Sequence, residues 1–242
     1  MQSRMSDGDK LESNVIVALD LDNLKEIEKN VKTLSSLTNW FKIGYQIISS
    51  IGIKESIEIV KSFNCKVFLD VKLYDIPNTV ANAVKNFSDL DVDMLTIHIS
   101  GGSKMIREAL KGVGSNNNTK VLGVTLLTSF SQEEAKKIYG LDNTMDITRK
   151  FVEIGYNSGL RWFVCSPLEL GLLKKEFTDC FFVVPGIRPV WSLKEDQERF
   201  ATPYQAKLNG ASYIVVGRPV LRPNNHRTPL EALKSIIEEF NA

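Results

Sequence analysis

The amino-acid sequence predicts an α/β protein folded as a single (β/α)8 barrel, a TIM barrel, on three observations. Short apolar runs alternate with segments of helical hydrophobic spacing, and eight such strand–helix units follow one another between residues 14 and 242. Strands separated by helices pair in parallel, and eight is the number that closes this kind of barrel. A chain of 242 residues, 43% of them hydrophobic, is long enough for one large core. An open doubly wound sheet is the alternative, although no GxGxxG motif follows the first apolar run.

The first half of the chain is expected to contain four strand–helix units. Apolar segments rich in β-branched and aromatic residues predict strands over residues 15–19, 40–45, 65–72 and 94–100. Helical spacing then predicts helices at residues 24–34 and 53–63, from Pro77 onward, and from Gly102 to Leu110. Pro77 suits the first position of a helix, because that position needs no backbone N–H donor.

The second half continues the alternation. Strands are predicted over residues 119–127, 161–166, 180–184 and 212–216, after a loop at 114–118. Helices are predicted at 132–139, 144–157 and 167–177, before Asn209-Gly210, and from Pro229 to the end, with a Pro-rich loop after Gly217-Arg218. The polar segment 186–200, hinged at Gly186, is a candidate lid. Residues 1–13 are polar and are expected to form a tail in front of the barrel domain, 14–242.

Charge, hydropathy and cysteine content limit the classes of partner. With 30 basic and 29 acidic residues, the net charge of +1 gives no field that would attract nucleic acid or an anionic membrane. No apolar run reaches the length of a membrane span. Cys65, Cys165 and Cys180 have no metal-ligand spacing and are odd in number, which indicates buried thiols in a reducing compartment. We therefore expect a cytoplasmic protein with neither nucleic acid nor membrane as a partner.

The most informative stretch is residues 68–79, FLDVKLYDIPNT. Side chains alternate along a strand, so Asp70 and Lys72 share one face, and Asp75 follows in the turn. Burying an ion costs several kcal/mol unless it is paired, so a strand that carries these charges indicates a functional site.

Further polar residues occur where the other predicted strands end, which is the active-site face of such barrels. They are Asp20, Lys42, His98, Thr128, Arg188 and Arg218. Gly217-Arg218 forms a turn of the kind that presents backbone N–H groups and a guanidinium to a phosphate. Structural roles stay open for several of them: Asp20 as a helix cap, His98 as a satisfied interior side chain, and Arg218 as a surface arginine.

Taken together, these motifs resemble those of the bacterial orotidine 5'-phosphate decarboxylase family. The resemblance runs from about residue 15 to the end of the chain, with separate motifs in the same order. The motifs are VALD ending at Asp20, FKIG around Lys42, FLDVKLYDIPNTV, VTLLTS at Thr128, PGIRP at Arg188, EDQ at Gln197 and VVGRPV at Arg218. Two departures are Tyr74, where relatives often have histidine, and a longer, more basic loop at 222–227.

This resemblance implies a carboxy-lyase that converts orotidine 5'-monophosphate to UMP and CO2, the last step of de novo pyrimidine biosynthesis, with no cofactor and no metal. It implies that Lys72 is the proton donor and that Asp70 and Asp75 keep it charged, with Lys42 completing the catalytic set. It further implies a homodimer in which Asp75, Ile76 and Thr79 reach into the neighbouring site. The remaining substrate-binding residues that it implies are Asp20, Thr128, Pro185, Arg188, Gln197, Gly217 and Arg218.

Two other functions stay open from the sequence. One is a Mg²⁺-dependent enzyme of the 3-keto-gulonate-phosphate decarboxylase and hexulose-phosphate synthase type, which shares the DxKxxD strand and stabilises an enediolate with its metal. The IPNT segment after Asp75 and the PGIRP segment favour the pyrimidine enzyme instead. The other is a non-catalytic barrel that only binds a nucleotide or a partner protein. The presence of Lys42, Asp70, Lys72 and Asp75 argues against it, because a binding module has no need for such costly buried charges.

Overall fold

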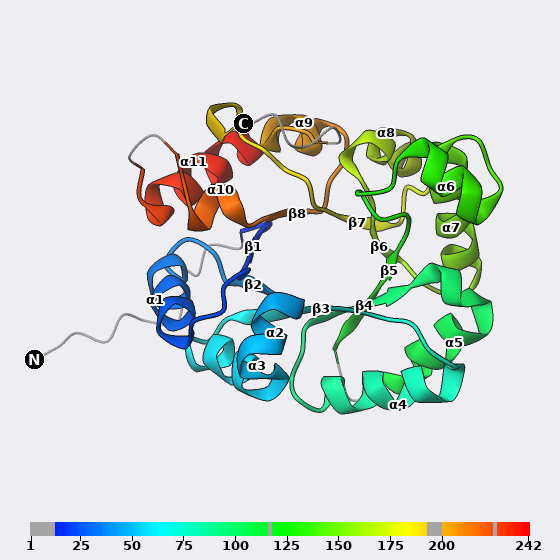
Figure 1. Ribbon diagram of the computed structural model, residues 1–242, viewed down its shortest axis with the longest axis horizontal. Coiled ribbons are helices and arrows are strands. Elements are labelled where there is room, and N and C mark those ends of the chain that lie inside the picture. The colour runs from blue at the N-terminus through cyan, green and yellow to red at the C-terminus, as the bar shows by residue number, and fades with distance from the viewer. Residues whose placement is uncertain (1–12, 116–117, 193–199, 225–226) are drawn as a thin grey trace, which may run out of the picture.

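The computed structural model describes residues 13–115, 118–192, 200–224 and 227–242. In these residues eight parallel strands, β1 to β8, form a closed barrel, and helices cover its outside (Figure 1). Each strand pairs with the next, and β8 returns to β1 with Val15 opposite Ile214. The predicted (β/α)8 barrel is thereby confirmed. Of the predicted tail, residues 1–12 lie outside the described residues, whereas Ser13 is buried and its hydroxyl accepts the N–H of Val15 at 3.2 Å.

All the strands are short, and β3 is the longest of them. Their bounds are β1 (Val15–Ala18), β2 (Trp40–Ile43), β3 (Lys66–Leu73), β4 (Met94–His98), β5 (Lys120–Val124), β6 (Trp162–Val164), β7 (Phe181–Val184) and β8 (Tyr213–Val216).

Helices follow the strands in sequence and pack their apolar faces on the barrel. They are α1 (Leu24–Leu34), α2 (Tyr45–Ile51), α3 (Ile53–Ser62), α4 (Pro77–Ser88), α5 (Gly102–Gly112), α6 (Gln132–Tyr139), α7 (Thr144–Asn157), α8 (Pro167–Glu176), α9 (Pro203–Leu208), α10 (Arg218–Leu221) and α11 (Pro229–Asn241), with 3-10 turns η1 (Ile99–Gly101) and η2 (Val190–Ser192). Within the described ranges, no helix has the length and apolar character to cross a bilayer.

Several element boundaries differ from the sequence prediction. The strand expected at 40–45 ends at Ile43, and the apolar run YQIISSI is helix α2 after the N-cap Gly44. A short helix, α10, replaces the start of the expected Pro-rich loop, since Pro219 fits its first turn. The strand expected at 119–127 ends at Val124, and Leu126 is buried in the loop that follows. An apolar run does not distinguish a buried loop from a strand.

Two apolar clusters stabilise the barrel, one inside it and one between the strands and the helices. The inner cluster consists of Ile16, Ala18, Trp40, Phe68, Met94, Leu122, Val183 and Val215. Val67, Leu69 and Val71 of β3 belong to the outer cluster. Since side chains alternate along a strand, Phe68 and Asp70 point into the barrel. On β3, the inner apolar cluster therefore ends at Phe68, and the next inward-facing residue is the charged Asp70.

Candidate active site

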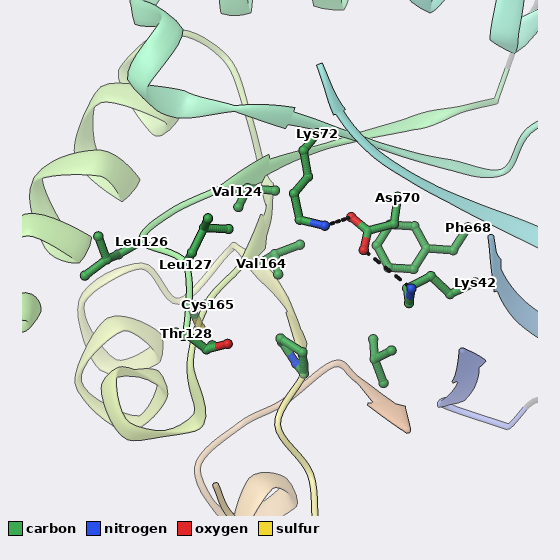
Figure 2. A pocket seen from close by; sticks show the side chains of 12 residues that line it. Lys42, Phe68, Asp70, Lys72, Val124, Leu126, Leu127, Thr128, Val164 and Cys165 are labelled. Carbon is green, nitrogen blue, oxygen red and sulfur yellow. Dashed lines mark hydrogen bonds and ion pairs between the residues drawn. The ribbon is translucent and has the colours of Figure 1, made fainter. Parts of the chain in front are cut away.

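A cavity of about 180 Å³ opens at the carboxyl end of the barrel. Figure 2 shows Lys42, Asp70 and Lys72 on one wall of it, with Leu127 and Thr128 on another. The cavity is lined by Lys42, Phe68, Asp70, Lys72, Val124, Leu126, Leu127, Thr128, Val164, Cys165, Pro185 and Val215. It thus joins a charged wall to an apolar one.

Four charged side chains of alternating sign form the charged wall, and we call Asp20, Lys42, Asp70 and Lys72 the charge array. The Lys42 ammonium lies 3.4 Å from Asp20 Oδ1 and 3.6 Å from Asp70 Oδ2. The Lys72 ammonium lies 2.8 Å from Asp70 Oδ1. Each charge is therefore next to a charge of opposite sign, which offsets the cost of removing it from water.

An irregular backbone in β3 places the last two members of the array. Leu69 is opposite Leu95 of β4, but the next pair is Leu73 with Ile97, so the register shifts between them. Lys72 has φ +46°, a left-handed conformation that costs a non-glycine residue roughly 1–2 kcal/mol. Asp70 and Lys72 both face the cavity, as predicted, although the backbone at Lys72 departs from regular strand geometry.

The electrostatic surroundings keep Asp70 ionised. Burial raises the pKa of Asp70, but the ammonium groups of Lys42 and Lys72 and hydrogen bonds from Lys72 and Thr96 outweigh that effect, so the pKa lies below its ordinary value. Burial and then the charge of Lys72 lower the pKa of His98, at the end of β4. The ring of Tyr74 contacts His98 edge-on. At neutral pH Asp70 is therefore ionised and the His98 imidazole is neutral.

A second cavity, also about 180 Å³, continues from the first and shares Lys42, Pro185 and Val215 with it. Its other lining residues are Ala18, Asp20, Gly186, Ile187, Arg188, Gly217 and Arg218. Burial and the nearby charge of Arg218 lower the pKa of Arg188. Neither guanidinium forms an ion pair with a carboxylate of the described ranges. Two adjacent guanidinium groups without such a carboxylate suit a phosphate dianion.

Two glycines leave room for the charge array. A Cβ at Gly44 would lie 2.8 Å from the Lys42 ammonium nitrogen. A Cβ at Gly217 would lie 3.0 Å from Asp20 Oδ2. A side chain at Gly44 would push the Lys42 ammonium aside, and a side chain at Gly217 would crowd the Asp20 carboxylate. The glycines of the FKIG and VVGRP motifs therefore provide space for two charges of the array.

The structure brings most of the predicted site residues together. Those lining the two cavities are Asp20, Lys42, Asp70, Lys72, Thr128, Pro185, Arg188, Gly217 and Arg218. Gln197 lies outside the described residues, as does most of the candidate lid. Asp75, Ile76 and Thr79 are exposed and line neither cavity. Asp75 Oδ1 accepts the N–H of Ile76 at 2.6 Å. Within one chain, the described contacts therefore do not place Asp75 beside Lys72.

Other site residues were not predicted from the sequence. The apolar wall contains Val124, Leu126, Leu127 and Val164, together with Cys165, whose thiol pKa burial raises strongly. Cys165 is therefore a neutral packing group. Thr96 of β4 donates a hydrogen bond to Asp70 Oδ1 at 3.1 Å, and a threonine within the apolar run MLTIHIS was a signal that could have identified it.

The fold and the site together define a (β/α)8-barrel enzyme with a charged pocket beside a pair of guanidinium groups. The chain belongs to the orotidine 5'-phosphate decarboxylase / HUMPS family, whose model matches residues 13–233. It is 34% identical to orotidine 5'-phosphate decarboxylase of Trichlorobacter lovleyi over 97% of this chain and 98% of the relative. Identity to the Lactobacillus acidophilus enzyme of that name is 37%, over 94% of this chain and 98% of the relative.

A solved structure supports the same family assignment. The crystal structure of orotidine 5'-phosphate decarboxylase from Lactobacillus acidophilus superposes with a TM-score of 0.79 at 33% sequence identity. The match covers 96% of this chain and 100% of that one. The family recognised from the sequence motifs is thus confirmed.

Proposed function

We propose that this chain decarboxylates orotidine 5'-monophosphate to UMP and CO2, the last step of de novo pyrimidine biosynthesis. The observation that carries the proposal is the charge array, which ends at Lys72 in the first cavity. That cavity is continuous with the part of the second cavity that Arg188 and Arg218 line, which we call the arginine site. A substrate with a planar ring at one end and a phosphate at the other matches this two-part cleft. Membership in the family supports the same reaction.

Each part of the cleft has a role in binding. Arg188 and Arg218, with Gly217 and Gln197, hold the phosphate, since guanidinium groups bind its oxygens by charge-assisted hydrogen bonds. Asp20 and Lys42, which line the second cavity beside them, hydrogen-bond the ribose hydroxyls. Thr128 contacts the base, whose faces pack on the apolar wall near Pro185.

In the chemical step, the bond from C6 of the pyrimidine to its carboxylate breaks and CO2 leaves. The electron pair remains on C6 in the plane of the ring, where it cannot delocalise into the π system. The Lys72 ammonium stabilises this charge and then transfers a proton to C6. Asp70, ionised because of its lowered pKa, pairs with the Lys72 ammonium at 2.8 Å and so holds it in the cavity. Enzymes reach accelerations of roughly 10^17-fold, and here charge placement and binding energy must provide the acceleration.

The proposal includes a cytoplasmic homodimer. The exposed positions of Asp75, Ile76 and Thr79 support their predicted reach into a neighbouring site, and Ile76, an apolar side chain, is 67% exposed. In such a dimer Asp75 of one subunit would flank Lys72 of the other. Cys65, Cys165 and Cys180 are all buried, and Cys165 and Cys180 are free thiols, which supports a reducing compartment.

The donor set of the site does not suit the metal-dependent alternative. Both oxygens of Asp70 face ammonium groups, at 2.8 and 3.6 Å, and Asp20 also pairs with Lys42. Two ammonium groups beside the carboxylates repel Mg²⁺, which binds through carboxylate oxygens and water. The observed geometry therefore favours a reaction in which a lysine ammonium, and not a metal ion, stabilises the negative charge.

An absorbance assay tests the proposal. Purified protein is mixed with orotidine 5'-monophosphate in a strong chelator without added metal, and the loss of substrate absorbance is followed. We expect full turnover in the chelator and none in the matched Lys72→Ala variant. Binding of UMP without turnover by the wild type would indicate a non-catalytic barrel, and activity that requires Mg²⁺ would contradict the metal-free reaction.

A further inference from the structure

The peptide unit that joins Val71 to Lys72 lies where β3 leaves the regular ladder. The register with β4 shifts between Leu69 and Leu73, and β2 ends at Ile43, opposite Leu69. The carbonyl of Val71 and the N–H of Lys72 belong to this one peptide unit. Buried backbone groups that leave a ladder need partners from side chains or water.

Two hydroxyl groups provide these partners. Tyr45, the first residue of α2, donates its hydroxyl to the Val71 carbonyl at 2.5 Å. The Thr96 hydroxyl, on β4, accepts the N–H of Lys72 at 2.9 Å and donates to Asp70 Oδ1 at 3.1 Å. The Lys72 ammonium donates to the same Asp70 oxygen at 2.8 Å. Thr96 and Asp70 therefore connect the backbone N–H of Lys72 to the ammonium of the same residue through three hydrogen bonds.

We infer that Tyr45 and Thr96 are positioning residues, whose hydroxyl groups hold the Val71–Lys72 peptide unit so that the Lys72 ammonium points at Asp70 and into the cavity. Neither residue lines the two cavities, so each acts through Lys72 and not on the substrate. The inference rests on the proposed function, in which Lys72 delivers the proton.

The geometry explains why this peptide unit needs two partners. Lys72 has φ +46°, and a lysine has no intrinsic preference for that conformation. Relaxation of the peptide unit toward an extended strand would rotate the direction of the Lys72 side chain. A displacement of a reacting group by about 1 Å can reduce a rate by about 100-fold. The hydrogen bond from Tyr45 holds the carbonyl of the unit and the hydrogen bond to Thr96 holds its N–H, so both oppose this rotation.

Tyr45→Phe and Thr96→Val remove one hydroxyl each, and Thr96→Ser keeps the hydroxyl. Tyr45 is 62% exposed, so the loss of its hydroxyl should leave folding intact. We expect kcat for orotidine 5'-monophosphate to fall about 10-fold in Tyr45→Phe and about 100-fold in Thr96→Val. KM and the Kd for UMP should stay within about twofold of wild type, and Thr96→Ser should recover most of kcat.

Two matched controls separate positioning from stability. Thr38 resembles Thr96, since its hydroxyl donates to the Val15 carbonyl at 2.7 Å and accepts the N–H of Trp40 at 3.2 Å, at the opposite end of the barrel. Thr38→Val should lower the thermal unfolding midpoint without changing kcat. Tyr204, partly exposed on α9, gives the control Tyr204→Phe, for which we expect wild-type kinetics and stability.

Wild-type kcat in folded Tyr45→Phe and Thr96→Val proteins would overturn the inference. A rise in KM without a fall in kcat would also overturn it. If the wild type does not decarboxylate orotidine 5'-monophosphate, the proposed function fails, and crystal structures of the wild type and both variants then decide the inference separately. Rotation of the Val71–Lys72 peptide unit away from Asp70 in the variants would support it, and an unchanged Lys72 conformation would contradict it.

Discussion

Replacing Asp70 with asparagine keeps the shape of the side chain and removes the central negative charge of the array. The Lys42 and Lys72 ammonium groups, now 3.6 and 2.8 Å from Asp70 oxygens, would then share a neutral amide. We expect Asp70→Asn to destabilise the fold and to abolish most of the activity, because two like charges remain in one cavity and Lys72 loses its carboxylate partner.

The expected loss of stability follows from the geometry. At an effective dielectric constant of about 20, each of these ion pairs contributes roughly 5–6 kcal/mol of Coulomb energy, most of which offsets the cost of burying the charges. Removing one partner of a buried pair typically costs about 3–5 kcal/mol. Lys42 keeps Asp20 at 3.4 Å, and the Lys72 side chain is 28% exposed and can turn toward water. The variant should therefore lose about 2–3 kcal/mol at pH 7.

The pH dependence gives a second check with a definite sign. The pKa of Asp70 is lower in the folded protein than its ordinary value of 3.8. The ionised carboxylate therefore contributes its full stability above about pH 5, and this contribution is lost as the pH falls through the lowered folded pKa. Asparagine does not titrate. The stability difference between wild type and Asp70→Asn should consequently be largest near pH 7 and should shrink below pH 4.

Urea unfolding followed by tryptophan fluorescence measures this difference, provided that the m-value is unchanged. Asp91→Asn is a suitable control, because Asp91 also pairs with a lysine, Lys61 at 2.9 Å, but its side chain is 87% exposed. Exposed ion pairs contribute little, so the control should unfold almost as the wild type does. Wild-type stability of Asp70→Asn at pH 7, or a loss that persists unchanged at pH 3, would refute the reasoning.

Three further outcomes follow from the proposed function. Lys72→Ala should fold and bind UMP but show no decarboxylation in the absorbance assay, and near-normal turnover would exclude Lys72 as the proton donor. Lys72→Ala and Asp75→Asn chains, each inactive alone, should regain partial activity when mixed; no recovery in demonstrated mixed dimers would indicate a self-contained site. Arg218→Ala should raise the Kd of UMP about 10- to 100-fold in calorimetry, because it removes charge-assisted bonds, and should leave the Kd of uridine unchanged. Equal losses for UMP and uridine would contradict a phosphate contact.

The charged part of the site was predictable because charges within an apolar strand are energetically costly. Asp70 and Lys72 were singled out on this ground alone, and the structure places both in the cavity. The order of strands then brought Asp20 and Lys42 to the same end of the barrel. Asp75 could not be placed in this way, because it is exposed in the isolated chain and its expected partner belongs to a second subunit.

The apolar wall and the backbone of β3 were not predictable for different physical reasons. Leu126 and Leu127 have the same composition as core residues, and only the three-dimensional course of the loop turns them toward the cavity. The left-handed conformation of Lys72 has no sequence signal, since neither glycine nor asparagine marks it. Tyr45 was predicted at the end of a strand, whereas it begins α2. Its hydrogen bond could not be predicted, because the partner carbonyl lies 26 residues away along the chain.

The two halves of the cleft differ in what they can contribute to catalysis. The charge array contains two carboxylates and two ammonium groups, so it is neutral as a whole and attracts no anion at long range. In the arginine site neither guanidinium forms an ion pair with a described carboxylate, so both are available to a phosphate in substrate and transition state alike. In the proposed reaction, negative charge moves from the substrate carboxylate to C6, toward Lys72, as CO2 leaves. Only the array therefore interacts more favourably with the transition state than with the substrate, and this is why changes at Lys72 should act on kcat and changes at Arg218 on affinity.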